Sequence, residues 1–177
     1  MATDYIYIAL RKSPELLKLF DLSSDFLVYG AICLFYATFL ILGLQKKKFN
    51  TVLLIEVTMG IFIALVLPLL LKNFFPSVRP ISYYFPDTQL LNSFPSQHVM
   101  MMATLAFIIM TNYVELGIVL LLTGVLVSIL RWVSLMHWPL DIFAGWILGF
   151  LVASAIVHTS KLLLDLRREK IAYQNQR

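Results

Sequence analysis

Three polar clusters interrupt an otherwise apolar stretch of sequence between Lys72 and Asp141. The first reads Lys-Asn-Phe-Phe-Pro-Ser-Val-Arg-Pro over residues 72–80, and the second reads Pro-Ser-Gln-His over residues 95–98. The third reads Arg-Trp-Val-Ser-Leu-Met-His-Trp-Pro-Leu-Asp over residues 131–141. Each cluster lies at the edge of a hydrophobic segment. The chemistry of the chain therefore depends on whether folding brings the three clusters to one place.

The composition is that of an integral membrane protein. Of the 177 residues, 60% are hydrophobic and only 14% are charged, which is far from the average of soluble domains. The net charge of +4 is modest, and nucleic acid is not suggested as a partner. The single cysteine, Cys33, lies in an apolar run and has no second cysteine with which to form an internal disulfide. We expect an all-α, polytopic bundle of membrane helices that forms one domain.

Five hydrophobic segments are candidates to cross the membrane. A helix rises about 1.5 Å per residue, so about 20 residues span a hydrocarbon core of about 30 Å. The third segment is short, and beginning its helix at Ser96 adds the missing turn. The five segments are residues 27–44, 52–71, 99–113, 116–136 and 140–157.

A short helix is expected before the first of these segments. Ser-Pro-Glu at residues 13–15 is typical of a helix start, and the leucines and phenylalanine that follow would let this helix lie in the membrane interface. We therefore expect one integral-membrane domain over residues 1–177, made of an interfacial leader (1–25), a helix bundle (26–160) and a cytoplasmic tail (161–177).

The alternation of five spans places all three clusters on one side of the membrane. The end of the second span, the start of the third and the connection between the fourth and fifth share that side. The opposite side receives the lysines of residues 46–48 and the basic tail that begins at Lys161. By the positive-inside rule the basic side is cytoplasmic. The clusters are then expected to face the periplasm from a bacterial inner membrane.

Two glycine spacings predict how the last two spans pack. Gly145, Gly149 and Ala153 lie on one helix stripe with Asp141. Gly117 and Gly124 lie on another stripe with Arg131. Two such stripes facing each other would hold Arg131 and Asp141 at the end of one seam. Glycine is also common in membrane helices without such a role.

The cations of the clusters indicate a phosphate site. Lys72, Arg79 and Arg131 at a membrane boundary are costly to desolvate, so their convergence calls for an anion. Guanidinium groups bind phosphate oxygens in pairs, and lysine adds a point charge. Ser96 stands at the expected start of the third span, where its hydroxyl and the following amides, from Gln97 onward, can bind an anion. Any one of these cations alone would be read as a snorkelling interface residue.

The histidines of the clusters suggest catalysis. His137 precedes Asp141 by four residues, so the carboxylate can accept one ring N–H and leave the other nitrogen nucleophilic. His98 is then available to protonate a leaving oxygen as a general acid. His158 has no comparable neighbours and is expected to be interfacial. A metal site is the competing reading, but the three cations would repel a divalent ion, so we expect no metal and no cofactor.

In order and spacing, the three clusters resemble the signature of the type 2 phosphatidic acid phosphatase superfamily of membrane lipid phosphatases. The resemblance implies a metal-independent phosphatase in which His137 attacks phosphorus to give a phosphohistidine that water hydrolyses. It also implies that Asp141 orients His137 and that His98 protonates the departing oxygen. The residues implied to hold the phosphate are Lys72, Arg79, Ser96, Gln97 and Arg131.

Two positions depart from the family pattern. Gln97 stands where the family usually has glycine, which raises the question of whether the backbone there needs a positive φ. Leu130 stands where the family usually has serine, so one hydroxyl ligand is missing. Ser128 or Ser134 would be the nearby substitutes.

The resemblance implies a phosphorylated membrane lipid as the substrate. Our first expectation is the 1-phosphate of lipid A, and the alternatives are undecaprenyl pyrophosphate and phosphatidylglycerophosphate. Transfer of the phosphate to a second lipid, in place of water, is a further possibility. A reading of a different class is a non-catalytic membrane scaffold or channel whose basic cluster only binds an anion. The motifs do not select the headgroup, and the oligomeric state is not readable from them.

Overall fold

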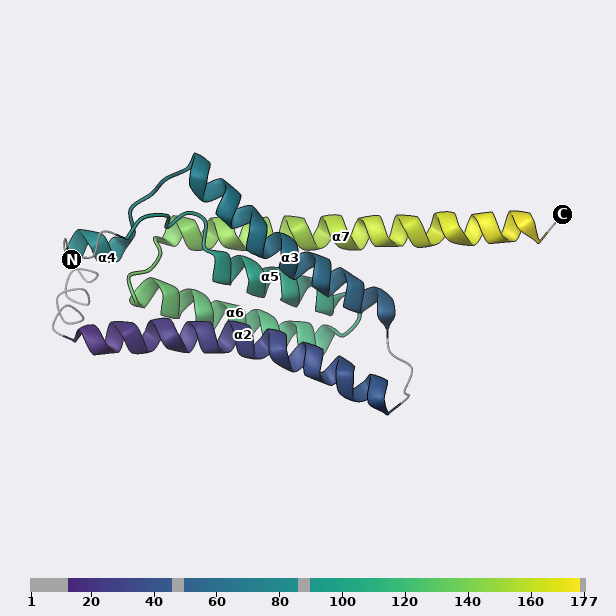
Figure 1. Cartoon of the computed structure of the whole chain (residues 1–177), viewed down its shortest axis with the longest axis horizontal. Helices are drawn as coiled ribbons and strands as arrows, with labels where there is room; N and C mark the ends of the chain where they lie inside the picture. The colour runs from purple at the N-terminus through teal and green to yellow at the C-terminus, as the bar shows by residue number, and fades with distance from the viewer. Residues whose placement is uncertain (1–12, 46–49, 86–89, 176–177) are drawn as a thin grey trace.

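The computed structural model describes residues 13–45, 50–85 and 90–175, and in these residues the protein is all-α. This confirms the all-helical part of the predicted fold class. Four of the helices are long and apolar enough to cross a membrane, and α5 is a shorter apolar helix. The described helices are α2 (Pro14–Leu44), α3 (Thr51–Phe74), α4 (Pro80–Tyr84), α5 (Gln97–Met110), α6 (Val114–Val133) and α7 (Pro139–Gln174) (Figure 1).

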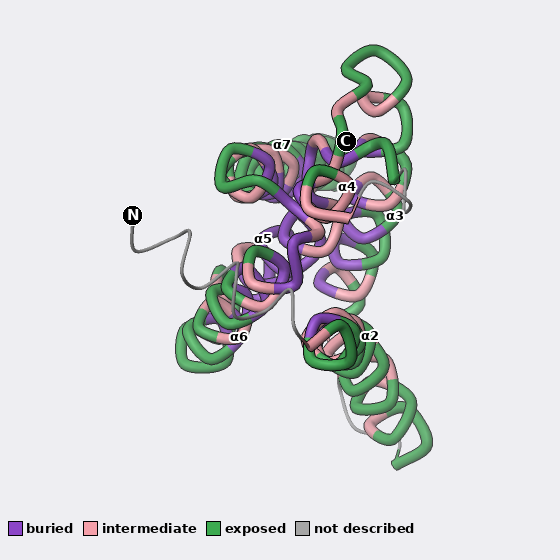
Figure 2. Tube along the Cα trace, turned by 90° about the vertical axis from the view of Figure 1, so that its left-hand side faces the viewer, coloured by how far each residue is buried: buried purple, intermediate pink, exposed green. Residues whose placement is uncertain are grey.

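Helix α5 is the centre of the bundle. Its 14 residues extend for only about 21 Å, and between Val99 and Ile109 every side chain except Phe107 is buried. A helix that is apolar on all sides must be covered on all sides, and α3, α6 and α7 pack directly against it. The buried segments of the trace accordingly lie inside the ring of longer helices (Figure 2).

Helix α2 joins two elements that the sequence predicted as separate. We expected an interfacial helix near Ser13 and then a span from Leu27, but one continuous helix runs from Pro14 to Leu44. No glycine or proline interrupts residues 15–29, so nothing in the sequence ends the helix there. Leu17, Ser24 and Val28 are buried, so the first turns pack on the bundle. Residues 1–12 of the predicted leader lie outside the described residues.

Helix α7 continues well beyond the bundle. It begins at Pro139, carries the last predicted span, and proceeds without a break to Gln174, so the basic tail is its exposed extension (Figure 1). Pro139 at the first position of this helix agrees with the predicted tight connection before it.

Small residues on α7 allow its close approach to α5. A Cβ atom added at Gly149 would lie 2.6 Å from Cβ of Ala103, and Gly145 makes a similarly close approach one turn earlier. In α6, Gly124 instead meets the indole ring of Trp146. The prediction that the two glycine stripes face each other is therefore wrong. The glycine stripe of α7 packs against α5, because the apolar side chains on every face of α5 have to be buried by neighbouring helices.

The substitution Gly149→Ala is expected to destabilise the protein, and Gly30→Ala is the matched control. The new methyl group at residue 149 would overlap α5, and overpacking of this kind costs about 1–3 kcal/mol. A Cβ atom at Gly30 of α2 would meet nothing within 4 Å, so only the better helix propensity of alanine acts there. Thermal unfolding in detergent measures the difference, and equal melting temperatures for the two variants would show that the α5–α7 approach is not tight.

Candidate active site

The three polar clusters meet at one end of the bundle. The end of α3, the start of α5, the end of α6 and the start of α7 lie at this end (Figure 1). Lys72 and Arg131 are in the last turns of α3 and α6, and His98 and Asp141 are in the first turns of α5 and α7. Lys72 is close enough to Arg79, Arg131 and Asp141 to interact with their charges. The structure thus brings together the residues that the alternation of spans predicted to converge.

The connection between α3 and α5 fixes the position of Arg79. The backbone N–H of Arg79 donates to the carbonyl oxygen of Leu90 at 3.1 Å, so the two arms of the connection pair beside it. Ile81, in the short helix α4, donates to the carbonyl oxygen of Leu135 at 2.9 Å and so docks this connection onto the one between α6 and α7. The guanidinium group of Arg79 lies 3.3 Å from the sulfur atom of Met136. Burial, and then the neighbouring Arg131 cation, lower the pKa of Arg79.

The connection between α6 and α7 places His137 in the interior. The N–H group of His137 donates to the carbonyl oxygen of Arg131 at 3.3 Å, and the imidazole is only 2% exposed. Leu135 adopts a φ of 60°, a left-handed conformation that is costly for a bulky side chain, by about 1–3 kcal/mol. Its side chain is buried, and this packing holds the strained turn in place.

Asp141 faces His137 but is fixed mainly by other groups. The Nδ1 atom of His137 lies 3.7 Å from Oδ2 of Asp141, which is an ion-pair contact beyond hydrogen-bond distance. The same oxygen accepts the N–H of Trp138 at 2.8 Å and the hydroxyl of Ser93. Burial lowers the pKa of His137 to about 4, although Asp141 opposes this shift, so the imidazole is neutral near pH 7.

Ser93 was not predicted from the sequence. It is fully buried, and its hydroxyl reaches Asp141 across 48 residues of chain. The only sequence signal is its position two residues before the Pro-Ser-Gln-His cluster, in a loop whose path the pattern of spans does not define.

At the start of α5, Ser96 and Gln97 occupy the expected positions. Ser96 is the N-cap and is completely buried, and its N–H donates to the carbonyl oxygen of Asp141 at 3.1 Å. Gln97 is the first helical residue. Among the described non-glycine residues a positive φ occurs only at Asn92 and Leu135, so residue 97 does not need the freedom of glycine. Its side-chain amide lies 3.5 Å from the carbonyl oxygen of Leu65 on α3, which leaves its backbone N–H as the group available to an anion.

The serines near Leu130 do not replace the missing hydroxyl. Ser128 donates to the carbonyl oxygen of Gly124 at 2.8 Å, and Ser134 donates to the carbonyl oxygen of Arg131 at 3.2 Å. Each hydroxyl has a single proton to donate. Neither therefore has a donor left for a phosphate oxygen.

Helix α2 adds two carboxylates that the sequence reasoning missed. Asp21 forms an ion pair with Arg131, and Asp25 lies 2.9 Å from Nε2 of His98 and 3.5 Å from Arg131. The ring of Tyr29 meets the His98 ring edge-on, with 5.8 Å between centroids. The available signal was two acids four residues apart, on the helix face that also carries buried side chains. Assigning these residues to an interfacial leader hid that signal.

Buried polar atoms without a partner are concentrated in this site. Within residues 13–45, 50–85 and 90–175, five buried side-chain atoms have no hydrogen-bond partner, and all five belong to the site. Native proteins rarely leave such atoms unpaired, because each costs about 1–3 kcal/mol. Three of them are donors, namely Nε of two arginines and a serine hydroxyl, which suits a ligand rich in acceptor oxygens. The five are Oδ1 of Asp25, Nε of Arg79, Oγ of Ser96, Nε of Arg131 and Nδ1 of His137.

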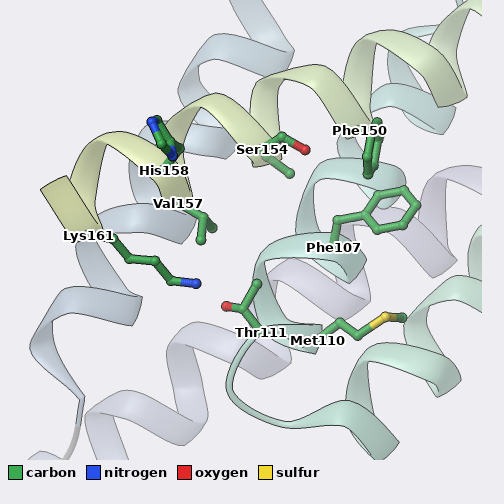
Figure 3. Close-up of a pocket in the computed structure, with 9 residues that line it drawn as sticks. Phe107, Met110, Thr111, Phe150, Ser154, Val157, His158 and Lys161 are labelled. Carbon is green, nitrogen blue, oxygen red and sulfur yellow. The ribbon is translucent and has the colours of Figure 1, made fainter.

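His158 lies away from this site, as predicted. It lines a hollow of about 360 Å³ between the end of α5 and the middle of α7 (Figure 3). The site lies at the start of α5, so the hollow is at the other end of that helix. In this hollow the Lys161 side chain points toward Thr111 (Figure 3). His158 therefore has no part in the constellation of His98 and His137.

Comparison with a solved structure supports the same architecture. The crystal structure of Aquifex aeolicus LpxE superposes with a TM-score of 0.59, covering 81% of this chain and 93% of that chain at 24% sequence identity. At this identity the likeness establishes a shared fold.

Comparison of sequences identifies the family. An undecaprenyl-diphosphatase of Sulfolobus acidocaldarius is 34% identical over 102 residues, which are 54% of this chain, and the match spans about half (49%) of that relative's length. The family model of the PAP2 superfamily matches residues 52–164, which contain all three polar clusters. The resemblance read from those clusters is confirmed, and the chain belongs to the PAP2 superfamily of membrane phosphatases.

Proposed function

We propose that this protein hydrolyses a phosphomonoester or a diphosphate on a lipid headgroup, through a phosphohistidine and without a metal ion. The observation that carries the proposal is the set of three unpartnered buried donors, from two arginines and a serine, in a chain that belongs to the PAP2 superfamily. A phosphate group offers acceptor oxygens to these donors and negative charge to the cations around them.

The phosphate is held by cations and by the start of a helix. Lys72, Arg79 and Arg131 neutralise its charge and stabilise the additional charge that develops on its oxygens in the transition state. The hydroxyl of Ser96 and the backbone amide of Gln97, at the N-terminus of α5, donate to the same group.

The reaction has two steps, and His98 donates a proton in the first and accepts one in the second. In the first, Nε2 of His137 attacks phosphorus, the P–O bond to the lipid breaks, and His98 gives its proton to the leaving oxygen. Asp141 faces Nδ1 of His137 and keeps the opposite nitrogen available for attack. In the second step, water attacks the phosphohistidine, the P–N bond breaks, and His98 takes the proton that water loses.

The charges of the site favour this mechanism over one that needs a divalent cation. Three cationic side chains surround the phosphate position, and the carboxylates of Asp21 and Asp25 are engaged by Arg131. A divalent ion would have to compete with the guanidinium group for these carboxylates. Activity is therefore expected to persist in EDTA.

An apolar groove supports a lipid as the substrate. It has a volume of about 640 Å³ and lies between α2 and α6, with Leu53 and Ile109 among its lining residues. It begins at Phe26, next to Asp25 of the site, and extends along α2 as far as Leu42. Such a lining suits an acyl or prenyl chain that stays in the bilayer while the headgroup enters the site.

The substitution His137→Ala is expected to lower phosphate release by about 10³-fold or more, because it removes the nucleophile. It should also abolish the acid-labile phosphoenzyme that is trapped when wild-type protein reacts with radiolabelled substrate in EDTA. His158→Ala, at the other end of the bundle, is the matched control and should retain both signals. Substantial activity in His137→Ala would exclude the phosphohistidine mechanism.

Our first candidate for the substrate is the 1-phosphate of lipid A, since the compact chain shares its fold with LpxE, a lipid A 1-phosphatase. The curated relative favours undecaprenyl diphosphate as the alternative. Phosphatidylglycerophosphate is the third candidate.

A panel of these three lipids in detergent, read by release of inorganic phosphate, should show the highest kcat/KM with lipid A. Faster release from undecaprenyl diphosphate would move the assignment to that lipid. A phosphorylated second lipid among the products would reveal phosphotransfer. If no lipid were hydrolysed, an anion-binding scaffold or channel would replace the enzyme.

We also propose that the site faces the periplasm of a bacterial inner membrane. The basic extension of α7 lies at the end of the bundle opposite the site, and the positive-inside rule assigns that end to the cytoplasm. Residues 46–48, which carry the same signal in the sequence, lie outside the described residues. Protease added to inverted vesicles should remove an epitope tag placed after Arg177, whereas right-side-out vesicles should protect it. The reverse pattern would place the site in the cytoplasm.

A further inference from the structure

The first turns of α2 bring two carboxylates to the active site. Asp21 and Asp25 lie one helical turn apart, and both contact the guanidinium group of Arg131, which is only 6% exposed. Carboxylates at the edge of a membrane helix are costly to desolvate, and they are retained where they pair with other charges or serve a function. Neither residue belongs to the three polar clusters.

The contacts around His98 define which of its ring nitrogens carries the proton. Arg131 Nη2 contacts Nδ1 of His98 and lies farther, 3.1 Å, from Nε2. A guanidinium group can only donate, and Nδ1 is the closer of the two ring nitrogens, so we assign the acceptor role to Nδ1 and the proton of the neutral ring to Nε2. That nitrogen lies 2.9 Å from Oδ1 of Asp25. The carboxylate therefore lies at ion-pair distance from this nitrogen, and its Oδ1 atom has no hydrogen-bond partner in this conformation.

The site thus contains a second pair of a histidine and a carboxylate. His137 faces Asp141 from within the α6–α7 region, whereas His98 of α5 faces Asp25 of α2. The second distance, 2.9 Å, is shorter than the first, 3.7 Å. The pairing joins helices that are far apart in sequence.

We propose that Asp25 is a positioning residue for the general acid His98, and that Asp21 is a positioning residue for Arg131. This inference rests on the proposed phosphatase function. Asp25 holds the orientation of the His98 ring and stabilises its protonated form through Nε2. Asp21 holds Arg131 at the place where its guanidinium group meets the phosphate.

The proposal gives the proton a defined path. An incoming phosphate takes over the Arg131 nitrogen that contacts Nδ1 of His98, and Nδ1 then takes up a hydronium proton from the solvent. As the P–N bond to His137 forms and the P–O bond breaks, that proton passes from Nδ1 to the leaving oxygen. His98 is again neutral and accepts the proton of the water that hydrolyses the phosphohistidine. Asp25 stays ionised throughout.

The other groups that face His98 do not substitute for Asp25. Lys72, Arg79 and Arg131 are cations and oppose a positive charge on the ring, and so does His137 when it is protonated. The ring of Tyr29 packs against the ring of His98 in a T-shaped arrangement and offers no carboxylate. Among these neighbours, Asp25 is the group placed to favour the imidazolium.

The test compares two phosphate monoesters that differ in the leaving oxygen, using full-length protein in detergent. Decyl phosphate has a poor alkoxide leaving group that needs a proton, whereas 4-nitrophenyl phosphate has a good leaving group that needs little help. Measuring the formation of the phosphohistidine in a single turnover isolates the phosphorylation step from the later hydrolysis. The ratio of the two rates within one variant does not depend on how much of the protein is folded.

Asp25→Asn is expected to slow phosphorylation by decyl phosphate about 10²-fold and by 4-nitrophenyl phosphate less than about 10-fold. Asp25→Glu should restore part of the loss. The variant His98→Ala should show the same dependence on the leaving group, and adding Asp25→Asn to it should cost little more. Glu15→Gln, in the exposed first turn of α2, should behave as wild type.

Asp21→Asn should act differently, because it weakens the positioning of Arg131, which binds the phosphate, and leaves the proton donor His98 in place. We expect an increase of KM with both esters and an unchanged ratio between them. If Asp25→Asn slowed both esters equally, or slowed neither, the positioning role would be overturned. If the wild-type protein formed no phosphohistidine with either ester, the proposed function would fail instead.

Discussion

The ion pairing of one buried guanidinium group, that of Arg131, determines how this end of the bundle is assembled. It joins the end of α6 to Asp21 and Asp25 of α2 and to His98 of α5. A buried charge that loses its partner costs several kcal/mol, so these contacts constrain three helices at once. They also leave Nε of Arg131 without a partner, and this donor remains for a ligand.

The convergence of the clusters was predictable because it follows from topology alone. Helices that alternate in direction must place Lys72, His98 and Asp141 at one end, whatever their packing. The contribution of Asp21 and Asp25 was not predictable in this way. Two acids on a helix near a membrane surface read as a solvated face, and only the tertiary position of Arg131 gives them partners.

The sequence also does not define which helices are neighbours, and this explains why the predicted contact between the two glycine stripes is wrong. The stripe of Gly145 and Gly149 correctly indicated a close approach, but a stripe does not say which neighbour it meets. The neighbour is α5, because a short helix with apolar side chains all round can bury them only at the centre. Gln97 shows the complementary case, since its place in the first turn of α5 removes the apparent need for glycine.

The left-handed turn at Leu135 affects how firmly His137 is positioned before the proposed reaction. Leu135, two residues before His137, is conformationally strained and tightly packed, so the backbone there has few alternative conformations. The imidazole of His137 is therefore already ordered before each reaction cycle. Under the proposed mechanism, the entropy of placing the attacking imidazole is then lost during folding and not in every turnover. The conformational cost at Leu135 would in this way lower the activation barrier of the proposed reaction.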